Sequence, residues 1–435
     1  MLRKQSHILV LAALVSLIAA GCSSSAKPAA GPSGTSGGAA GSSANTASDV
    51  GVTPTTIKVG YISSQTGVAS STSVGSFAGA IARFDLQNAQ GGVNGRKIEL
   101  VPQDDQSSLT QFLTDAQDLV QNKKVFGVLP VSSFTFSGAS YLNKQGIPVA
   151  GSAFDGPEWG LQPYSNMFSF LPPFSTTFAG KNYDYNFYGK FLRDIGVTKL
   201  AGVAYSISPS SLEAVHAILA SAASAGVANC YTDYSVPFGA VDFTATALAI
   251  KNAGCSGTVA ALVDSSNNAL AQAETNAGSI SKHWFEQGYD QQTLDSPAAR
   301  RTDQGAYVSS SVLFSPSIPA VATMLGALQK YGHFKAGAIP NFGTWTSYAA
   351  ADLFIRGLEA AGRNPTRQSF ITSLRTVTGY DVGGLLPYRI SFTGFGTPAM
   401  FPTTACGYFV QLKGGTWVPF QGNGQVCGTR ISFNY

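Results

Sequence analysis

The sequence is poor in charged residues and in the residue types that build most catalytic and metal centres. Of its 435 residues 11% are charged, four are histidine and five are cysteine. His216, His283 and His333 lie far apart, and no C-x-x-C pair, H-E-x-x-H run or phosphate-binding G-x-x-x-x-G-K-[ST] loop occurs. We therefore expect a protein that is not an enzyme and that holds no metal and no organic cofactor.

Basic clusters are missing as well. The formal net charge is +4, and Arg3 and Lys4 supply two of these charges near the N-terminus. No basic face emerges that would neutralise phosphates, which argues against nucleic acid as a partner. The 44% of hydrophobic residues and the 48 glycines are typical of buried α/β sheets with tight turns. A chain of 435 residues exceeds what one hydrophobic core usually serves, so two lobes are expected.

The N-terminal segment is typical of exported proteins. Arg3 and Lys4 precede an apolar run, Ile8 to Ala20, that is too short to span a bilayer comfortably. Ala20-Gly21-Cys22 resembles a bacterial lipoprotein cleavage box. We predict a signal peptide over residues 1–21, a lipid on Cys22, and a flexible Ser/Gly/Ala linker over residues 22–50. The alternative is an ordinary secretory signal followed by an incidental cysteine. The predicted location is extracytoplasmic, with the chain anchored to the cell membrane.

Residues 57–105 are predicted to form a strand, a helix and a second strand. Ile57–Ile62 and Lys97–Val101 are apolar strand patterns, and the second runs into Asp104-Asp105. Between them lies a loop rich in Ser, Thr and Gly, then a helix, then the turn Gly91–Gly95, whose residues tolerate positive φ. Such a βαβ unit belongs to an open α/β sheet, which binds ligands beyond the carboxyl ends of its strands.

One motif in this unit carries a family resemblance. The run Gly91-Gly92-Val93-Asn94-Gly95-Arg96-Lys97-Ile98-Glu99-Leu100-Val101, followed by Asp104-Asp105, resembles the extracytoplasmic substrate-binding proteins of ABC importers, in the leucine/isoleucine/valine-binding branch. The resemblance extends in weaker form from about residue 57 to residue 361. It implies the type I periplasmic binding protein fold, with two doubly wound parallel-sheet lobes joined by a multi-strand hinge. It also implies a small-molecule ligand, ABC permease subunits as partners, and a monomer.

The βα rhythm indicates where the two lobes exchange. It continues through Ile147–Ala150, changes around Phe168–Pro173, and begins a new series at Lys199–Ala204. In the family the chain later returns to the first lobe and then crosses once more, which we place near Cys406. We therefore assign residues 51–172 and 305–405 to lobe 1 and residues 173–304 and 406–435 to lobe 2.

Four cysteines remain if Cys22 carries a lipid, and four cysteines allow three connectivities. The pairing that is local in sequence joins Cys230 to Cys255 and Cys406 to Cys427. Cys230 begins one predicted strand and Cys255 just precedes another, so neighbouring parallel strands would bring them together. Four buried free thiols are the alternative, which is disfavoured outside the cytosol.

Binding residues in the first lobe are assigned by the resemblance. The serine-rich loop of the family falls on Ser132 and Ser133, which otherwise merely end a strand by local hydrogen bonding. The family's Ala-x-Thr falls on Ala153 and Asp155, so a carboxylate replaces the threonine hydroxyl. That carboxylate would repel a ligand carboxylate and attract an amine or guanidinium. Alternatively Asp155 is a helix N-cap, because Pro157 follows it.

Binding residues in the second lobe are nominated by position. Each lies at or just past the end of a predicted strand, where a ligand is expected: Tyr205, Asp264, Ser265, Tyr289 and Asp290. The aromatic series from Tyr183 to Phe191 is interpreted instead as the packing face of a helix.

The leading hypothesis is a lipid-anchored solute receptor that captures an amino acid or a similar small polar solute between two lobes and delivers it to a membrane permease. The alternative is a sensor ectodomain of the same fold that signals to a separate membrane partner. An exported hydrolase is a third, weaker hypothesis.

Overall fold

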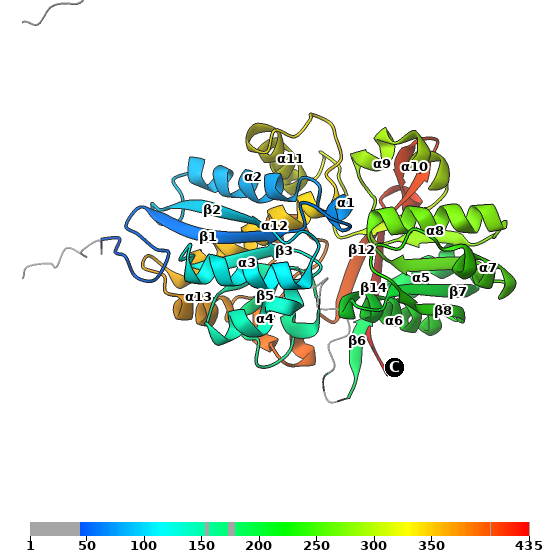
Figure 1. The fold of residues 1–435 in the computed structure, drawn as a ribbon, viewed down its shortest axis with the longest axis horizontal. Helices are drawn as coiled ribbons and strands as arrows, with labels where there is room; N and C mark the ends of the chain where they lie inside the picture. The colour runs from blue at the N-terminus through cyan, green and yellow to red at the C-terminus, as the bar shows by residue number, and fades with distance from the viewer. Residues whose placement is uncertain (1–43, 153–155, 173–177, 179, 401, 435) are drawn as a thin grey trace, which may run out of the picture. The chain divides into compact units, whose positions relative to one another are not determined.

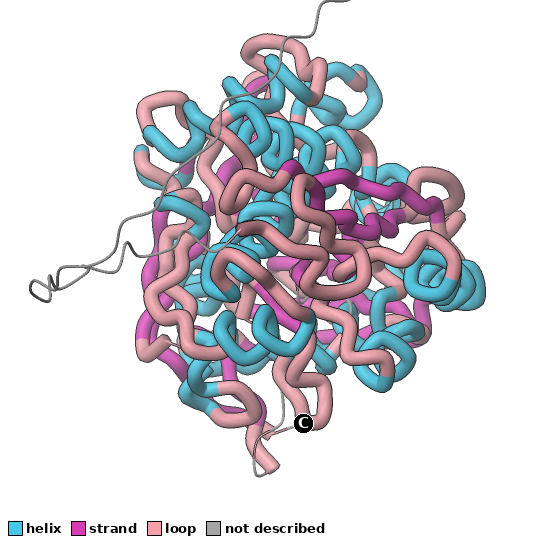
Figure 2. Tube along the Cα trace, turned by 90° about the vertical axis from the view of Figure 1, so that its left-hand side faces the viewer, coloured by secondary structure: helices cyan, strands magenta, loops and turns pink. Residues whose placement is uncertain are grey.

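The computed structural model describes residues 44–152, 156–172, 178, 180–400 and 402–434 (Figure 1). They form two α/β lobes, as predicted, each built on one sheet. Seen from the side of lobe 1, helices lie around the strands (Figure 2). Cys22, Ala153 and Asp155, for which the sequence predicts a role, fall outside the described residues. No helix in the described part of the chain has the length and apolarity needed to cross a membrane.

Lobe 1 contains a five-stranded parallel sheet in the order β2-β1-β3-β4-β5. Its strands are β1 (Thr56–Ser63), β2 (Lys97–Asp104), β3 (Gly127–Val131), β4 (Val149–Gly151) and β5 (Met167–Ser169). Its helices are α1 (Ser70–Ser73), α2 (Ser76–Ala89), α3 (Leu109–Gln121), α4 (Thr135–Lys144), α11 (Pro319–Tyr331), α12 (Phe342–Ala361) and α13 (Arg367–Leu374).

Alternation along the strands sends side chains to two separate cores. Val59 and Leu129 pack in a core with α2 and α12, whereas Ile62 and Val128 pack in a core with α3 and α4. Both faces of the sheet are therefore covered, as a parallel sheet requires. In Figure 1 the blue helix α2 lies beside the yellow α12, so segments far apart in the sequence complete one layer.

Lobe 2 contains a nine-stranded mixed sheet, in the order β6-β14-β12-β11-β10-β9-β7-β8 with β13 beside β12. Its strands are β6 (Asn182–Tyr185), β7 (Lys199–Tyr205), β8 (Ala228–Val236), β9 (Gly257–Ala261), β10 (Lys282–Phe285), β11 (Tyr307–Ser310), β12 (Thr404–Lys413), β13 (Thr416–Pro419) and β14 (Gln425–Phe433). Its helices are α5 (Phe187–Asp194), α6 (Pro209–Ser224), α7 (Thr244–Asn252), α8 (Asp264–Ala277), α9 (Gln291–Asp295) and α10 (Pro297–Thr302). Short 3-10 turns occur at Pro157–Trp159, Val382–Gly384, Phe392–Gly394, Pro398–Met400 and Phe420–Gly422.

The second sheet differs from the doubly wound parallel sheet that the sequence predicted. Strands β7 to β11 are parallel, but β12, β14 and β6 continue the sheet with antiparallel pairings. β11 begins after residue 305, where the chain was expected to return to lobe 1, yet it pairs with β10. The return therefore follows Ser310. A strand of only four residues gives no periodicity by which the sequence alone would place it.

Three local predictions also need correction. The apolar run Val125–Leu129 predicts a strand that breaks at Pro130, but β3 continues through Pro130, which pairs in register with Ile62. The N–H that proline lacks falls on the β4 side, where Val128 and Val149 form the β3–β4 pair. The loop expected over residues 63–76 contains the short helix α1, held by Asn341, whose side-chain amide donates to the carbonyl of Ser71. Tyr183 and Tyr185 lie on a strand rather than on a helix.

The end of the predicted linker is fixed in place rather than free. The guanidinium of Arg96 is buried and donates to the carbonyls of Thr53 (2.7 Å) and Thr46 (2.8 Å) and to the side chain of Asn364 (2.9 Å). Residues 44–50 are thereby tied to the loop before α13. A buried guanidinium must satisfy its donors with such acceptors, so this arginine organises the N-terminal edge of lobe 1.

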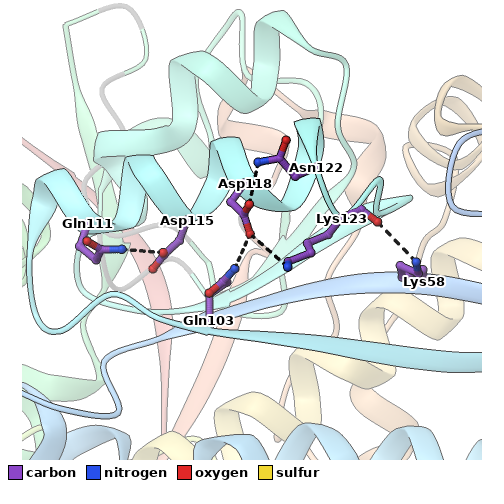
Figure 3. A network of polar contacts seen from close by, with 7 residues as sticks. All are labelled: Lys58, Gln103, Gln111, Asp115, Asp118, Asn122 and Lys123. Carbon is purple, nitrogen blue, oxygen red and sulfur yellow. Dashed lines mark hydrogen bonds and ion pairs between the residues drawn. The ribbon is translucent and has the colours of Figure 1, made fainter.

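Helix α3 is tied to the sheet by polar side chains at its solvent edge (Figure 3). Asp118 accepts hydrogen bonds from Gln103 of β2 (2.7 Å) and from Asn122 (2.8 Å). Lys123 lies 4.0 Å from the same carboxylate, and Lys58 of β1 donates to the Lys123 carbonyl. These contacts fix the helix across β1 and β2 beside the buried core.

The two disulfides are the pairs predicted from the sequence, Cys230–Cys255 and Cys406–Cys427. The second joins directly paired residues of β12 and β14. The first does not join neighbouring strands as expected, because β7 lies between β8 and β9. Cys230 instead occupies the irregularity of β8 opposite Leu200 and Ala201, which lets it reach the turn before β9.

Candidate functional site

One pocket receives side chains from both lobes. It has a volume of about 150 Å³ and lies beyond the carboxyl ends of β7, β9, β10 and β11. Lobe 1 contributes Ser133, Leu171, Pro172, Phe342 and Trp345. The other lining residues are Asp184, Tyr185, Phe187, Tyr188, Tyr205, Ser208, Ser210, Ser211, Ala214, Phe238, Ala261, Leu262, Val263, Glu286, Gln287, Ser309, Ser310, Ser311, Tyr388, Ala405, Cys406 and Gly407. The pocket is therefore rich in aromatic rings and hydroxyl groups.

Two carboxyl groups line the pocket. Asp184 lies on β6, is 5% exposed, and its Oδ2 has no hydrogen-bond partner. Burial raises the pKa of Asp184 to about 8, and the charge of Glu286 adds to the shift. Glu286 directly follows β10, and burial raises its pKa to about 7. No lysine or arginine lines the pocket among the described residues. The site thus contains two acids whose ionisation no lysine or arginine of the described lining would compensate.

Aromatic rings hold the walls together and reach from one lobe to the other. Phe134, at the start of α4, lies with its ring centroid 5.2 Å from that of Phe238 in lobe 2. The Phe238 ring is 4.8 Å from that of Tyr205 at the end of β7. On the opposite wall Phe342 and Trp345, in the first turn of α12, lie 5.6 Å apart. These rings give the pocket an apolar body between its polar ends.

Helix α6 begins at the pocket with a group of serines. Ser208 is the N-cap and accepts from the backbone N–H of Ser211. The hydroxyl of Ser211 donates to the carbonyl of Ala261 (2.6 Å) and accepts from the N–H of Tyr205 (2.9 Å). Ser211 is therefore committed to the ends of β7 and β9, and Ser208 caps the helix that they position.

Helix α1 bridges the lobes at the edge of the pocket. The hydroxyl of Thr72 donates to the side-chain oxygen of Gln287, 2.7 Å away. On the lobe 1 side, the side-chain amide of Asn341 donates to the carbonyls of Ser71 and Thr72. The hydrogen bond between Thr72 and Gln287 joins α1 to the loop after β10, and Asn341 joins α1 to the N-terminus of α12. The two lobes are therefore in contact in this structure.

The structure brings together only some of the residues nominated from the sequence. Ser133 and Tyr205 both line the pocket. Ser132 is 2% exposed and does not line it; its hydroxyl donates to Asp105 and accepts from the N–H of Phe134 (3.1 Å). Ser132 therefore supports the loop that carries Ser133.

The other four nominated residues that the structure describes do not line the pocket. Asp264 begins α8 and is buried, while Ser265 beside it is exposed. Asp290 is the N-cap of α9 and accepts from the N–H of Thr293 (2.7 Å). Tyr289 packs against Trp417 of β13, with ring centroids 5.6 Å apart. The chain turns after β9 and β10, so Asp264 and Ser265 lie in the first turn of α8, and Tyr289 and Asp290 immediately precede α9.

Sequence reasoning missed the two carboxyl groups. Asp184 stands among tyrosines in a segment interpreted as a packing face, and the signal was a lone acid in an apolar run. Glu286 comes immediately after β10, whereas the sequence predicted that this strand runs from Trp284 to Tyr289, and Tyr289 was nominated instead. The residue directly after the strand, Glu286, lines the pocket, and Tyr289 three residues later does not.

Asp105, the last residue of the family-like motif, organises the loops around the pocket. It is fully buried and accepts hydrogen bonds from Ser64 Oγ (2.7 Å), from the N–H of Ser107 (2.9 Å) and from Ser132 Oγ. Burial raises its pKa, and the hydrogen bonds from Ser132 and Ser64 oppose the shift. Asp105 thus joins the loops that follow β1, β2 and β3.

We expect Asp105→Ala to lower the free energy of unfolding by about 2 kcal/mol, because two buried donors and one partly buried donor lose their acceptor. Asp105→Asn keeps the shape and one acceptor, so it should lose less than half as much. Urea unfolding followed by circular dichroism measures both. Equal stability of the alanine variant and the unchanged protein would contradict this role of Asp105.

Within the described residues no group of three or more His, Cys, Asp or Glu side chains is placed to hold a metal ion. The pocket volume of about 150 Å³ is that of a cavity in another protein that accommodates benzene.

Several solved structures with a similar fold are titled as binding proteins of ABC transporters. A solute-binding protein of an ABC transporter from R. palustris, solved with benzoate, gives a TM-score of 0.69 at 16% identity, covering 86% of this chain and 97% of that one. A fatty acid ABC transporter substrate-binding protein from Thermomonospora curvata gives 0.67 at 18% identity, covering 88% and 94%. A leucine-binding protein from Thermotoga maritima gives 0.67 at 14% identity, covering 85% and 98%. At these identities the likeness shows the fold.

The sequence comparison extends beyond the fold. No curated protein sequence matches the chain. The profile of the periplasmic binding protein family, however, matches residues 56–416, which is well over half of the chain and includes both lobes. The chain therefore belongs to the periplasmic binding protein family, the family of the ABC-transporter solute-binding proteins, as the motif at residues 91–105 indicated.

Proposed function

We propose that this chain is the extracytoplasmic solute-binding lipoprotein of an ABC transporter, and that the pocket captures a small organic solute for delivery to a membrane permease. The sequence favours an amino acid or a similar small polar solute. The observation that carries the proposal is a pocket beyond the carboxyl ends of the lobe 2 strands that is also lined by Ser133, Leu171 and Trp345 of lobe 1.

A ligand that touches both lobes favours the conformation in which they meet. The gain equals the difference in ligand affinity between the closed and open forms. Residues from both lobes line the pocket, so a bound solute adds contacts in the closed form that the open form lacks. The hydrogen bond between Thr72 and Gln287 and the contact between Phe134 and Phe238 add protein–protein contacts in the same direction. The permease would then recognise the closed form.

The proposed membrane attachment uses the segment before residue 44. A lipid on Cys22 and a linker of small residues would hold the lobes near the permease while leaving them free to turn. A monomer suffices for this function, because one chain supplies both walls of the pocket.

Titration calorimetry on protein that has been unfolded and refolded to remove copurified ligand tests the proposal. We expect at least one solute from a panel of amino acids, amides, amines and aromatic acids to bind and to raise the melting temperature. Ser133→Tyr fills the pocket from lobe 1 and should abolish that binding, whereas Ser265→Tyr, at an exposed position on α8, should leave it unchanged. Silence across the whole panel would refute the proposal.

A further inference from the structure

The carboxyl group of Asp184 is the most unusual feature of the pocket. It lies on β6, where the chain enters lobe 2, and is 5% exposed. The residue lines the pocket, and its buried Oδ2 has no hydrogen-bond partner. A buried carboxylate without a partner costs several kcal/mol, and a protein retains such a group where something else completes it.

The surroundings of Asp184 indicate the charge of that missing partner. Glu286 is the second acid of the pocket, and it raises the pKa of Asp184 through its charge in addition to the larger effect of burial. Among the described lining residues there is no lysine or arginine to oppose the two acids. The two acids would repel a ligand carboxylate, whereas they would attract an ammonium group to the carboxylate oxygens of Asp184 and Glu286.

The aromatic residues of the pocket walls indicate what the rest of the ligand is like. Rings of Tyr185, Tyr188, Phe187 and Tyr388 line the pocket beside the acids. Aromatic faces attract cations and pack well against another ring. The volume of about 150 Å³ limits the ligand to one ring with a short chain.

We infer that the pocket takes a small aromatic amine with a single positive charge, and that Asp184 and Glu286 hold its ammonium group while the tyrosine and phenylalanine rings surround its body. The inference rests on the proposed function and names the class of solute within it. It separates this chain from a receptor for an aromatic acid, and it places the free amine ahead of the corresponding amino acid.

The protonation state of the site provides a readout. Burial raises the pKa of Asp184 to about 8, so the empty pocket holds a proton at neutral pH. The titratable groups around it are Glu286 after β10, Tyr185 on the same strand, Tyr188 on α5, and Tyr388. Arg430 of the neighbouring strand β14 acts on Tyr185 but does not line the pocket, and it donates to the carbonyl of Pro398. An incoming ammonium therefore supplies the cation that the pocket lining lacks and stabilises the carboxylate. Binding should therefore release protons, and affinity should rise between pH 6 and pH 8.

Four phenyl compounds that differ only in their polar group test the inference by calorimetry: 2-phenylethylamine, phenylalanine, 3-phenylpropionate and 2-phenylethanol. We expect the amine to bind at least about 100-fold tighter than the propionate and about 10-fold tighter than the alcohol, as an ion pair in a desolvated site allows. Titrations in buffers of different ionisation enthalpy should show release of protons with the amine.

Two variants assign the effect to its residues. Asp184→Asn should weaken binding of 2-phenylethylamine by about 30-fold and leave 2-phenylethanol within a factor of three, because only the charged contact is lost. Glu286→Gln should act in the same direction. Asp242→Asn, fully exposed and outside the pocket, is the control and should change neither. Melting temperatures of all three variants verify that they fold.

The outcomes distinguish the inference from the proposed function. Tighter binding of phenylalanine, of 3-phenylpropionate or of the alcohol than of the amine would overturn the inference and leave a solute receptor. An Asp184→Asn variant that binds the amine as well as the unchanged protein would overturn it too. Absence of binding by these compounds and by the wider panel would overturn both.

Discussion

Replacing Gly79 by alanine should lower the free energy of unfolding by about 3 kcal/mol, although alanine is the better helix former. Gly79 lies in α2 where this helix crosses α12. A Cβ at this position would overlap the carbonyl oxygen of Thr344 and lie 3.2 Å from the Cβ of Ser347. A backbone carbonyl cannot rotate away as a side chain can, so the two helices must separate and the core between them must open.

Gly326 provides the matched control, because it also lies inside a helix. It is exposed on α11, and a Cβ added there would meet nothing within 4 Å. Gly326→Ala should therefore raise stability by about 0.5–1 kcal/mol through helix propensity alone. Urea unfolding of the two variants should give opposite signs. Stabilisation by both substitutions would show that α2 and α12 are not as close as the structure places them.

The same substitution should reach the pocket. Thr344 precedes Trp345, and Phe342 and Trp345 line the pocket from the first turn of α12. Displacing that turn by a few tenths of an ångström moves both rings relative to lobe 2. Gly79→Ala should therefore weaken the ligand found for the unchanged protein, while Gly326→Ala should not. The packing of α2 against α12 thus determines the position of Phe342 and Trp345 in the pocket wall.

Much of lobe 1 was predictable because its signals are local. The strand at Ile57–Ile62 and the turn at Gly91–Gly95 were read from apolar runs and from residues that tolerate positive φ, and the structure has both. The family-like motif then supplied the strand order. Asp105 shows what this approach misses, since a motif identifies the residue but not its three hydrogen-bond donors.

The pocket was harder to predict because it depends on pairing between distant strands. β6 is a four-residue strand that pairs with β14, about 250 residues later, and only this pairing brings Asp184 to the pocket. Tyr205 was found because it lies at the end of a strand of the regular βα series, and Ser133 because the serine-rich loop of the resembling family falls on it. Asp264 and Asp290 also follow strands, yet each begins or caps a helix and is directed elsewhere. A position near the end of a strand therefore identifies candidate pocket residues, but it does not tell which of them line the pocket.

A cluster of three aspartates in lobe 2 should make the protein less stable as pH rises. Asp264, Asp290 and Asp303 are at most 8% exposed, and Oδ1 of both Asp264 and Asp303 lacks a hydrogen-bond partner. Burial, reinforced by the charge of Asp290, raises the pKa of Asp303 to about 7, and burial raises that of Asp290 to about 6. Burial and the other two charges raise the pKa of Asp264 as well.

The sign follows from proton counting. An aspartate in the unfolded chain titrates near pH ~4, so between about pH 4 and pH 7 the folded protein binds more protons than the unfolded chain. Stability conferred by these protons is complete at low pH and is lost as pH rises through the folded pKa values. His283 acts oppositely, because burial lowers its pKa to about 4, but it is one group against three. We expect stability at pH 8 to lie several kcal/mol below that at pH 5, of order ~1.4 kcal/mol per pKa unit.

Asp303→Asn isolates this effect. The amide has the shape of the protonated acid and cannot ionise, so at pH 8 the variant should be more stable than the unchanged protein by about 4 kcal/mol. At pH 5 this advantage should fall to about 1.5 kcal/mol, because Asp303 is then protonated in the folded protein and ionised only in the unfolded chain. Asp194→Asn, exposed at the end of α5, should change neither value. Urea unfolding at both pH values measures the stability difference between the variant and the unchanged protein. If this difference is no larger at pH 8 than at pH 5, ionisation of Asp303 in the folded protein does not cost stability.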